Sequence, residues 1–318
     1  MNRLASLSLL RTDYRMGSLC FPLRLLLGLP WPLKRWIASR RRTWRYYTGL
    51  CRRLGWTKVH PAWFTSPNGP YAGIKLPVNH PNELWIPSGT YEPSITRVLV
   101  QLLTDERWSI KDKSVWDIGA HHAVTALLFA KHGAAEVVGL EPLPANLEII
   151  RTVLAANESL AAKIRILPLA ASVAEGEAVI ETGATDSEGQ LVHDQVTPSE
   201  RRPDGSKRIA VCTSRLDHLL AKGFSPPGLL KIDIEGAEFL ALQGARQLLL
   251  NHRPVLVIEI HNAGACAKCV ELLRSLSYGV WRISAKGLNA LRDRTMDYGH
   301  VLCVPLEHTN RRALPYLA

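Results

Sequence analysis

Residues 114–141 read SVWDIGAHHAVTALLFAKHGAAEVVGLE, and this stretch decides the fold. Residues 114–118 are a short apolar strand pattern, followed directly by a glycine, Gly119, and containing an acid at its end, Asp117. A helical pattern follows over residues 123–131, and residues 136–140 form a second apolar run that leads to Glu141. A strand, a helix and a second strand in this order predict a parallel βαβ unit.

The same alternation of strands and helices continues through the rest of the chain. Further helical patterns cover residues 90–103, 144–157, 237–250 and 268–276, and further strand patterns cover residues 164–168, 229–234, 255–260, 280–283 and 301–304. Residues 177–208, between the third and fourth strands, are polar and predict a hairpin with an exposed loop. We therefore expect an α/β fold with a mostly parallel sheet flanked by helices.

The composition is that of a globular protein and excludes several other classes. Apolar residues make up 47% of the 318 residues and charged residues 21%, which argues against a disordered or fibrous chain. No apolar run reaches the roughly 18 residues that a transmembrane helix needs. Six cysteines are too few for a disulfide scaffold, so we expect a reducing, cytoplasmic location.

The positive charge of the chain is concentrated at its N-terminus. Residues 1–65 contain 13 basic side chains, one acid and five of the nine tryptophans, and so carry a charge of +12. Because the whole chain carries +11, the remaining residues sum to −1. Within this basic extension, residues 33–54 combine an aromatic stripe at helical spacing with arginines that fall mostly off the stripe.

The sequence leaves three interpretations of the basic extension open. The stripe can pack on the rest of the protein, or residues 1–54 can contact a partner or an anionic membrane at its inner face. An acid-poor N-terminus rich in arginine and serine is also typical of a targeting presequence. No nucleic-acid-binding motif accompanies the basic segment, so we expect no nucleic-acid partner.

Acidic residues gather at the ends of four predicted strands. They are Asp117, Glu141, Asp233 with Glu235, and Glu259 with His261 close by. In an open parallel sheet, ligands bind outside the carboxyl ends of the strands, near the point where the strand order reverses. We therefore expect these side chains to surround a ligand, with the tight turn at Gly119 letting the backbone approach it.

The spacing of the first two acids suits a ligand that contains adenosine. Glu141 lies 24 residues beyond Asp117, where an acid can accept hydrogen bonds from both ribose hydroxyls. A dinucleotide would need a G-x-G-x-x-G cradle for its pyrophosphate, but Gly119 is followed by AHHA. S-adenosylmethionine (SAM) has no phosphate and needs only the turn and the carboxylates. The glycine pattern thus favours SAM over a dinucleotide. The acids alone are a weak signal, because acids at strand ends occur in any doubly wound domain.

Several short motifs resemble the FkbM family of SAM-dependent methyltransferases. They are Tyr91-Glu92-Pro93, Asp117-Ile118-Gly119-Ala120, Leu140-Glu141-Pro142 with Asn146, Leu216-Asp217, Lys231-Ile232-Asp233-Ile234-Glu235-Gly236-Ala237-Glu238, Gly244-Ala245 and residues 254–259. The resemblance covers residues 91–283 and is most specific at residues 231–238. It implies a Rossmann-like class I methyltransferase fold with a seven-stranded sheet, SAM as methyl donor, and O-methylation of a hydroxyl on a sugar, glycan or small metabolite.

The sequence departs from the family pattern in the first of its turns. The family usually has Asp-x-Gly-Ala-Asn-x-Gly, but here His121 replaces the asparagine and Ala123 replaces the second glycine. An added methyl group is tolerated where φ is negative and is costly where φ is positive. The alternative to an active enzyme is therefore a catalytically degenerate module that binds a membrane or a protein partner through its basic N-terminus.

The resemblance and the strand ends together give the expected site residues. For the cofactor they are Asp117, Gly119, Ala120, His121, Glu141, Asn146 and Asp233. Methyl transfer to a hydroxyl needs in-line positioning and a base that takes the proton. We expect Asp233 to contact the cofactor or the acceptor, and either Glu235 or His261 to be the base. Glu235 and Glu238 can instead stabilise the helix that follows them.

We expect no bound metal. His121 and His122 are adjacent and should point in different directions, so at most one of them faces the site. Cys266 and Cys269 form a C-x-x-C pair without a second pair, and we interpret them as ordinary thiols on a helix. No pattern in the sequence specifies the acceptor.

Four parts are expected along the chain. Residues 1–65 are the basic extension and residues 66–112 a lead-in segment with one helix. Residues 113–306 are the SAM-dependent methyltransferase domain, and residues 307–318 are a C-terminal tail.

Overall fold

The structure is a computed structural model that describes residues 33, 62–78, 91–108, 110–182, 189–192, 207–291 and 296–309. The chain divides into two compact units, one up to Thr96 and one from Arg97 onward. The interpretations of residues 1–54, including the membrane contact, lie outside the described residues except for position 33. The same holds for most of the C-terminal tail.

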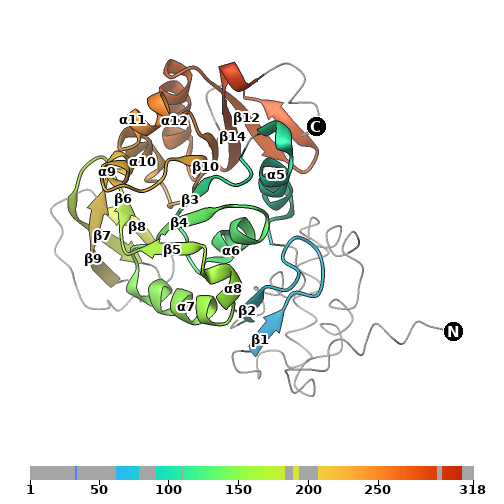
Figure 1. Cartoon of the computed structure of the whole chain (residues 1–318). Helices are drawn as coiled ribbons and strands as arrows, with labels where there is room; N and C mark the ends of the chain where they lie inside the picture. Colours follow the sequence, from blue (N-terminus) through green and yellow to red (C-terminus); the bar gives the residue numbers. More distant parts are fainter. Residues whose placement is uncertain are drawn as a thin grey trace. The chain divides into compact units, whose positions relative to one another are not determined.

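An eight-stranded sheet, counted over the described residues, forms the centre of the second unit (Figure 1). Its parallel strands are β5 (Ile164–Leu167), β4 (Glu136–Leu140), β3 (Ser114–Ile118), β10 (Pro227–Ile232) and β11 (Val255–Ile260). Antiparallel strands continue the sheet beyond β11: β14 (Gly299–Pro305), β12 (Tyr278–Ser284) and β13 (Gly287–Ala290). The predicted α/β fold with a mostly parallel sheet is confirmed.

The strand order reverses at β3. From β3 the sheet extends through β4 and β5 on one side, and β10 and β11 lie on the other side. The carboxyl ends of β3 and β10 therefore lie side by side at the topological switch point, where open α/β sheets bind their ligands. In register, Asp117 on β3 is the neighbour of Lys231 on β10.

Helices pack on the sheet through apolar side chains. Buried residues of α9 (Leu216–Ala221), α10 (Glu238–Gln243), α11 (Arg246–Asn251) and α12 (Ala263–Ser275) form one core with the strands. Alternate strand residues such as Trp116, Ile118 and Ile232 point into this core and are fully buried. α6 (Val124–Lys131) packs against β3, β4 and β5, and all of its residues from 124 to 130 are buried.

Most predicted elements have the expected positions, and three differ. α12 begins at Ala263 and not near residue 268, because the side chain of Asn262 accepts a hydrogen bond from the backbone N–H of Ala265 and caps the helix there. The expected helix over residues 237–250 is two helices, α10 and α11. The carboxylate of Asp217 accepts hydrogen bonds from the backbone N–H groups of Gln247 and Leu248 at 3.0 and 2.8 Å, so these donors do not continue α10. The sheet also gains an eighth strand, because residues 287–290 form a hairpin with β12.

A smaller sheet follows β5. It contains β6 (Ala170–Ala171), β9 (Lys207–Ser214), β7 (Gly176–Thr182) and β8 (Gly189–Val192). The antiparallel pair β7 and β8 is the hairpin expected in the polar segment. Residues 183–188 and 193–206, which contain the expected loop, lie outside the described residues.

The remaining elements complete the described part of the chain. α7 (Pro144–Ala155) and α8 (Glu158–Ala161) connect β4 to β5, and α5 (Pro93–Thr104) precedes β3. In the first unit, β1 (Ala62–Thr65) and β2 (Lys75–Val78) form an antiparallel hairpin. Among the described helices, none is both long enough and apolar enough to cross a membrane.

Candidate active site

The turn after β3 touches the loop after β10. Gly119 has a φ of +86°, and a Cβ atom on it would lie 1.8 Å from the backbone oxygen of Asp233. Only glycine fits here, because any side chain would overlap that oxygen and would also be strained at this φ. The neighbour that requires this glycine is the protein's own backbone, and the sequence alone did not indicate it.

Two residues of the same turn have left-handed backbones although they are not glycine. His121 has a φ of 49° and Ala123 a φ of 61°. An alanine in this conformation costs about 1 kcal/mol relative to glycine. The departure from the family pattern at position 123 therefore falls where the backbone is strained.

The carboxylate of Glu141 holds this turn in place. One of its oxygens accepts a hydrogen bond from the backbone N–H of His121 at 2.8 Å. The other accepts from the backbone N–H of Leu143 at 2.9 Å and from the side-chain amide of Asn146 at 3.1 Å. Burial raises the pKa of Glu141 to about 6, although the three hydrogen bonds oppose the shift. A ribose contact would have to share these oxygens with donors of the protein.

Asp117 is a buried partner of Lys231. Its side chain is fully buried, and Lys231 Nζ lies 3.3 Å from Asp117 Oδ1 and 3.1 Å from Asp233 Oδ2. Burial raises the pKa of Asp117, and the positive charge of Lys231 opposes that shift. The lysine thus connects the ends of β3 and β10 through two carboxylates.

His121 and His122 form a stacked pair. Their ring centroids lie 3.8 Å apart and the ring planes differ by 17°. The expectation that these adjacent side chains point in different directions is therefore wrong, and the left-handed backbone at His121 is the physical reason. Burial, together with the neighbouring His122 and Lys231, lowers the pKa of His121 to about 3. Burial also lowers the pKa of His122, against a hydrogen bond with Asn146.

A second group of side chains lies at the ends of β10 and β11. Nδ1 of His261 lies 2.7 Å from Oε1 of Glu238, an acid whose side chain is fully buried. Nε2 of His261 lies 3.4 Å from Glu235 Oε2 and 3.8 Å from Asp233 Oδ1. The three residues expected to be catalytic thus lie together, and Glu238 contacts one of them.

The acids around His261 keep its imidazole protonated. Burial by itself would lower the pKa of His261. The hydrogen bond to Glu238 and the charges of Glu235, Glu238 and Glu259 outweigh burial and raise the pKa to about 9. His261 is therefore an imidazolium at neutral pH. Glu235, with a φ of 53° and a side chain 41% exposed, is the most open acid that pairs with it.

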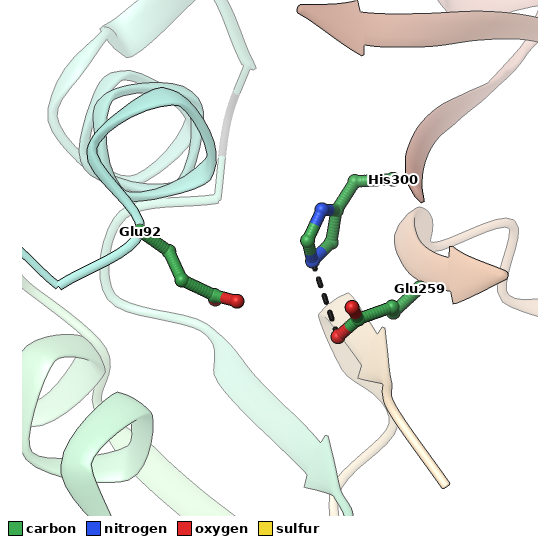
Figure 2. Close-up of side chains that lie close together, drawn as sticks. All are labelled: Glu92, Glu259 and His300. Carbon is green, nitrogen blue, oxygen red and sulfur yellow. Dashed lines mark ion pairs between the residues drawn. The ribbon is translucent and has the colours of Figure 1, made fainter. Parts of the chain in front are cut away.

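Glu259 connects this group to β14. Its Oε2 lies 3.3 Å from His300 Nε2 (Figure 2), and its Oε1 accepts a hydrogen bond from the hydroxyl of Tyr298. Burial works in the opposite direction, but these partners lower the pKa of Glu259. The ring of Tyr298 packs edge-on against His261, with centroids 5.8 Å apart. Sequence reasoning missed Tyr298 and His300, because neither lies in a motif.

Three donor atoms in this group are close enough for a metal ion. Asp233, Glu259 and His261 each offer one atom within 4.8 Å of the others. Acidic groups of this kind are common without a metal, so the expectation of no bound metal stays a prediction.

Comparison with known sequences identifies the family. The methyltransferase FkbM domain matches residues 117–279, which is half of the chain. The chain belongs to the FkbM methyltransferase family. This confirms the resemblance seen in the sequence, and with it the class I methyltransferase fold and SAM as the cofactor.

Several solved methyltransferase structures are similar to this FkbM-family chain at low sequence identity. Methyltransferase FkbM from Methylobacillus flagellatus KT is 17% identical, with a TM-score of 0.39 over 66% of this chain and 58% of that chain. An O-methyltransferase from Bacillus cereus in complex with SAH is 12% identical, with a TM-score of 0.38 over 67% of this chain and 82% of that chain. A precorrin-6y C5,15-methyltransferase from Geobacter metallireducens GS-15 is 14% identical, with a TM-score of 0.36 over 66% and 85%.

The match spans less than two thirds of the first of these structures. No curated protein matches the chain.

The residues at the switch point fit a cofactor with a positive charge. Carboxyl groups outnumber cations there: the acids are Asp117, Asp233, Glu235, Glu238 and Glu259, and the cationic or titratable bases are Lys231, His261 and His300. The sulfonium of SAM would offset part of this excess. Nε2 of His121 and Nε2 of His122 are buried and have no hydrogen-bond partner among the described residues, which leaves two polar atoms for a ligand.

The residues expected to bind the cofactor fall into two groups by burial. Asp117, Ala120, Glu141 and Asn146 are buried and hold the loops together. Gly119, His121 and Asp233 are partly exposed, so these three could contact the cofactor directly.

Proposed function

We propose that this FkbM-family protein transfers a methyl group from SAM to a hydroxyl group of a sugar, a glycan or a small metabolite. One observation carries the proposal: two acids, Asp233 and Glu235, lie 3.8 and 3.4 Å from Nε2 of His261 at the switch-point edge of the sheet. An acceptor hydroxyl at this edge would meet both acceptors for its proton and groups that can orient it.

The chemistry needs little covalent help from the protein. When bound, SAM supplies a methyl group that is already activated by the sulfonium. The acceptor oxygen forms a bond to the methyl carbon, the carbon–sulfur bond breaks with its electron pair remaining on sulfur, and the hydroxyl proton passes to a base. Glu235 and His261 are the candidate bases, and Asp233 is a contact for the cofactor or the acceptor.

Binding of the cofactor is the first test. Calorimetric titration of the full chain with SAM and with S-adenosylhomocysteine should give saturable binding of both. Protein that is folded by circular dichroism yet binds neither would overturn the proposal.

Transfer to a hydroxyl is the second test. Methyl-labelled SAM is incubated with panels of monosaccharides, phenols and primary amines, and the label is expected in the hydroxyl compounds alone. On an acceptor found this way, Asp233→Asn and Glu235→Gln should each reduce turnover, whereas Glu158→Gln, an exposed acid on α8, should not. Unchanged turnover in both site variants would remove these residues from the mechanism.

A second candidate function is a degenerate module that binds a partner and not SAM. The left-handed backbones of His121 and Ala123 favour it, because they fall where the family pattern has asparagine and glycine. Failure to bind SAM would support this function. Co-sedimentation with anionic vesicles, for the full chain and for a chain without residues 1–54, tests the membrane contact of the basic extension; equal partitioning would remove it.

A further inference from the structure

We propose that Glu238 is a positioning residue, which holds the imidazole of His261 so that Nε2 faces the acceptor, and that His261 and not Glu235 is the base. The inference rests on the proposed function, because it assigns a base to the same reaction. It concerns a residue that can be read from the sequence as a simple helix-stabilising acid.

The side chain of Glu238 is fixed from two directions. Glu238 is the first residue of α10, and its Oε1 accepts a hydrogen bond from the backbone N–H of Gly236 at 2.8 Å. The same oxygen lies 2.7 Å from Nδ1 of His261. Because Gly236 is in the loop after β10 and His261 follows β11, this one carboxylate connects the two loops. Such a contact does more than stabilise a helix end.

The contact with Glu238 determines which nitrogen of His261 is free. A carboxylate only accepts hydrogen bonds, so Nδ1 must carry the proton in the Glu238 contact. Nε2 then faces Glu235 at 3.4 Å and Asp233 at 3.8 Å, and both separations are longer than the 2.7 Å contact at Nδ1. In the neutral ring, Nε2 holds the lone pair. This nitrogen is therefore the one that can take a proton from an acceptor hydroxyl.

The ring of His261 also contacts an aromatic side chain. Tyr298 packs edge-on against it, with ring planes at 73°, while the Tyr298 hydroxyl donates to Glu259. Rotation of the His261 side chain would break the Glu238 contact and lose this packing. Glu235, by contrast, is a loop residue with a left-handed backbone, and its side chain is 41% exposed. The histidine is the better-fixed of the two candidate bases.

Among the described residues, charged groups from several neighbouring elements act on His261. Glu238 comes from α10, Asp233 and Glu235 from the loop after β10, and Glu259 from β11. Lys231 on β10 pairs with Asp233, and His300 on β14 lies beside Glu259, so each of these two side chains has an acid of its own. Burial opposes the proton, but the acids raise the pKa of His261 to about 9. The base form is scarce at neutral pH, and turnover should increase about tenfold per pH unit up to pH 9.

The first experiment needs neither SAM nor an acceptor. Nitrogen-15 NMR of the full chain with labelled histidine, assigned with His261→Gln, follows the ring from pH 5 to pH 11. We expect the neutral ring above its pKa to carry its proton on Nδ1 and to leave Nε2 bare. A neutral ring protonated on Nε2 would overturn the proposal even if every Glu238 variant failed to fold.

The second experiment separates positioning from charge. In Glu238→Gln the pKa of His261 should fall by about one unit or more and the Nδ1–H preference should be lost. In Glu235→Gln the pKa should also fall, but the Nδ1–H preference should remain. Glu158→Gln should change neither. An unchanged His261 pKa and tautomer in a folded Glu238→Gln protein would contradict the proposal.

The third readout is the pH profile of turnover on an identified acceptor. The rise of turnover with pH should shift to lower pH in Glu238→Gln, by the same amount as the pKa of His261 measured by NMR. If SAM binding fails but the tautomer is as expected, the proposed function falls and the Glu238–His261 contact stands. If SAM binds and the tautomer is the opposite one, the positioning role falls alone.

Discussion

The loops after β3 and after β11 contain partly buried histidines with opposite charge states. His121, after β3, has its pKa lowered to about 3, whereas His261, after β11, has its pKa raised to about 9. Near each ring lie a left-handed non-glycine residue and a buried acid that binds a backbone N–H. Near the first ring these are His121 itself and Glu141, which accepts from the N–H of His121; near the second they are Glu235, in the loop after β10, and Glu238, which accepts from the N–H of Gly236. The backbones are thus held in a similar way, and the rings are not.

The partner of each ring explains the difference. Burial favours a neutral imidazole, and the stacked His122 and the nearby Lys231 lower the pKa of His121 further. The ring of His261 contacts a fully buried carboxylate and faces two more. Acids in contact with the ring can therefore reverse the effect of burial. One loop presents neutral donors and acceptors to a ligand, and the other presents a charged ring.

The largest expected effect comes where the loop after β3 touches the loop after β10. In Gly119→Ala the new Cβ would lie 1.8 Å from the backbone oxygen of Asp233, so the loops must separate. We expect a loss of more than about 5 kcal/mol in the free energy of unfolding, measured by urea denaturation. Gly223→Ala is the matched control: it has the same φ of +86° but open space around it, and should cost about 1 kcal/mol. Equal losses would mean that the loops do not approach this closely.

The neutral histidine should make the protein sensitive to acid. The folded pKa of His121 is about 3 against an ordinary 6.5, so the unfolded chain binds the proton first as pH falls. Stability is then lost between pH 6.5 and pH 3, by up to about 5 kcal/mol over the whole window. His121→Asn should flatten this slope, because asparagine tolerates a left-handed backbone and has no proton to gain. The measurement is the unfolding midpoint across this pH range, with His252→Asn at an exposed position as control. If stability falls with pH equally steeply in His121→Asn and in the unmodified protein, the prediction is wrong.

The charged histidine should act on the alkaline side. The folded pKa of His261 is about 9 against an ordinary 6.5, so its contribution is fully present below pH 6.5 and is lost as pH rises through 9. The shift corresponds to about 3 kcal/mol. His261→Gln should remove this loss of stability with rising pH. The variant also leaves Glu238 unpaired, but the destabilisation from that change is the same at each pH. Denaturation from pH 6 to pH 10 measures it, with exposed His308→Gln as control; a slope that survives in His261→Gln would assign the effect elsewhere.

The smallest expected effect tests the strain in the first loop. Ala123→Gly should stabilise the protein by about 1 kcal/mol, because glycine has no penalty at a φ of 61°. The midpoint in urea should rise with an unchanged slope. Ala126→Gly, in the middle of α6, should instead destabilise by about 1 kcal/mol. A loss of stability in Ala123→Gly would show that the methyl group contributes more by packing than it costs in strain.

Much of the fold could be predicted from local pattern alone. The strands β3, β4 and β11 begin and end where their apolar runs do, because buried parallel strands are nearly continuous apolar segments. The break between α10 and α11 could not be predicted, because it depends on Asp217, far away in the sequence, accepting from the N–H groups of Gln247 and Leu248. The hairpin strand β13 was missed because its residues, Gly287–Ala290, are few and include glycine and asparagine, which are rare in strands.

For the site, the sequence by itself determined which side chains are available: acids at the ends of four strands, one glycine turn and the block of residues 231–238. It also determined that the family glycine is missing at position 123. The tertiary structure decided which of these groups are buried, which are paired, and which nitrogen of each histidine is engaged. The charge of an imidazole depends on atoms within a few ångströms of it, and for His261 these atoms come from α10, the loop after β10 and β11. No local sequence pattern specifies which acids lie close to the ring. The sequence therefore identified His261 as a site residue, but its charge as an imidazolium depends on the folded chain.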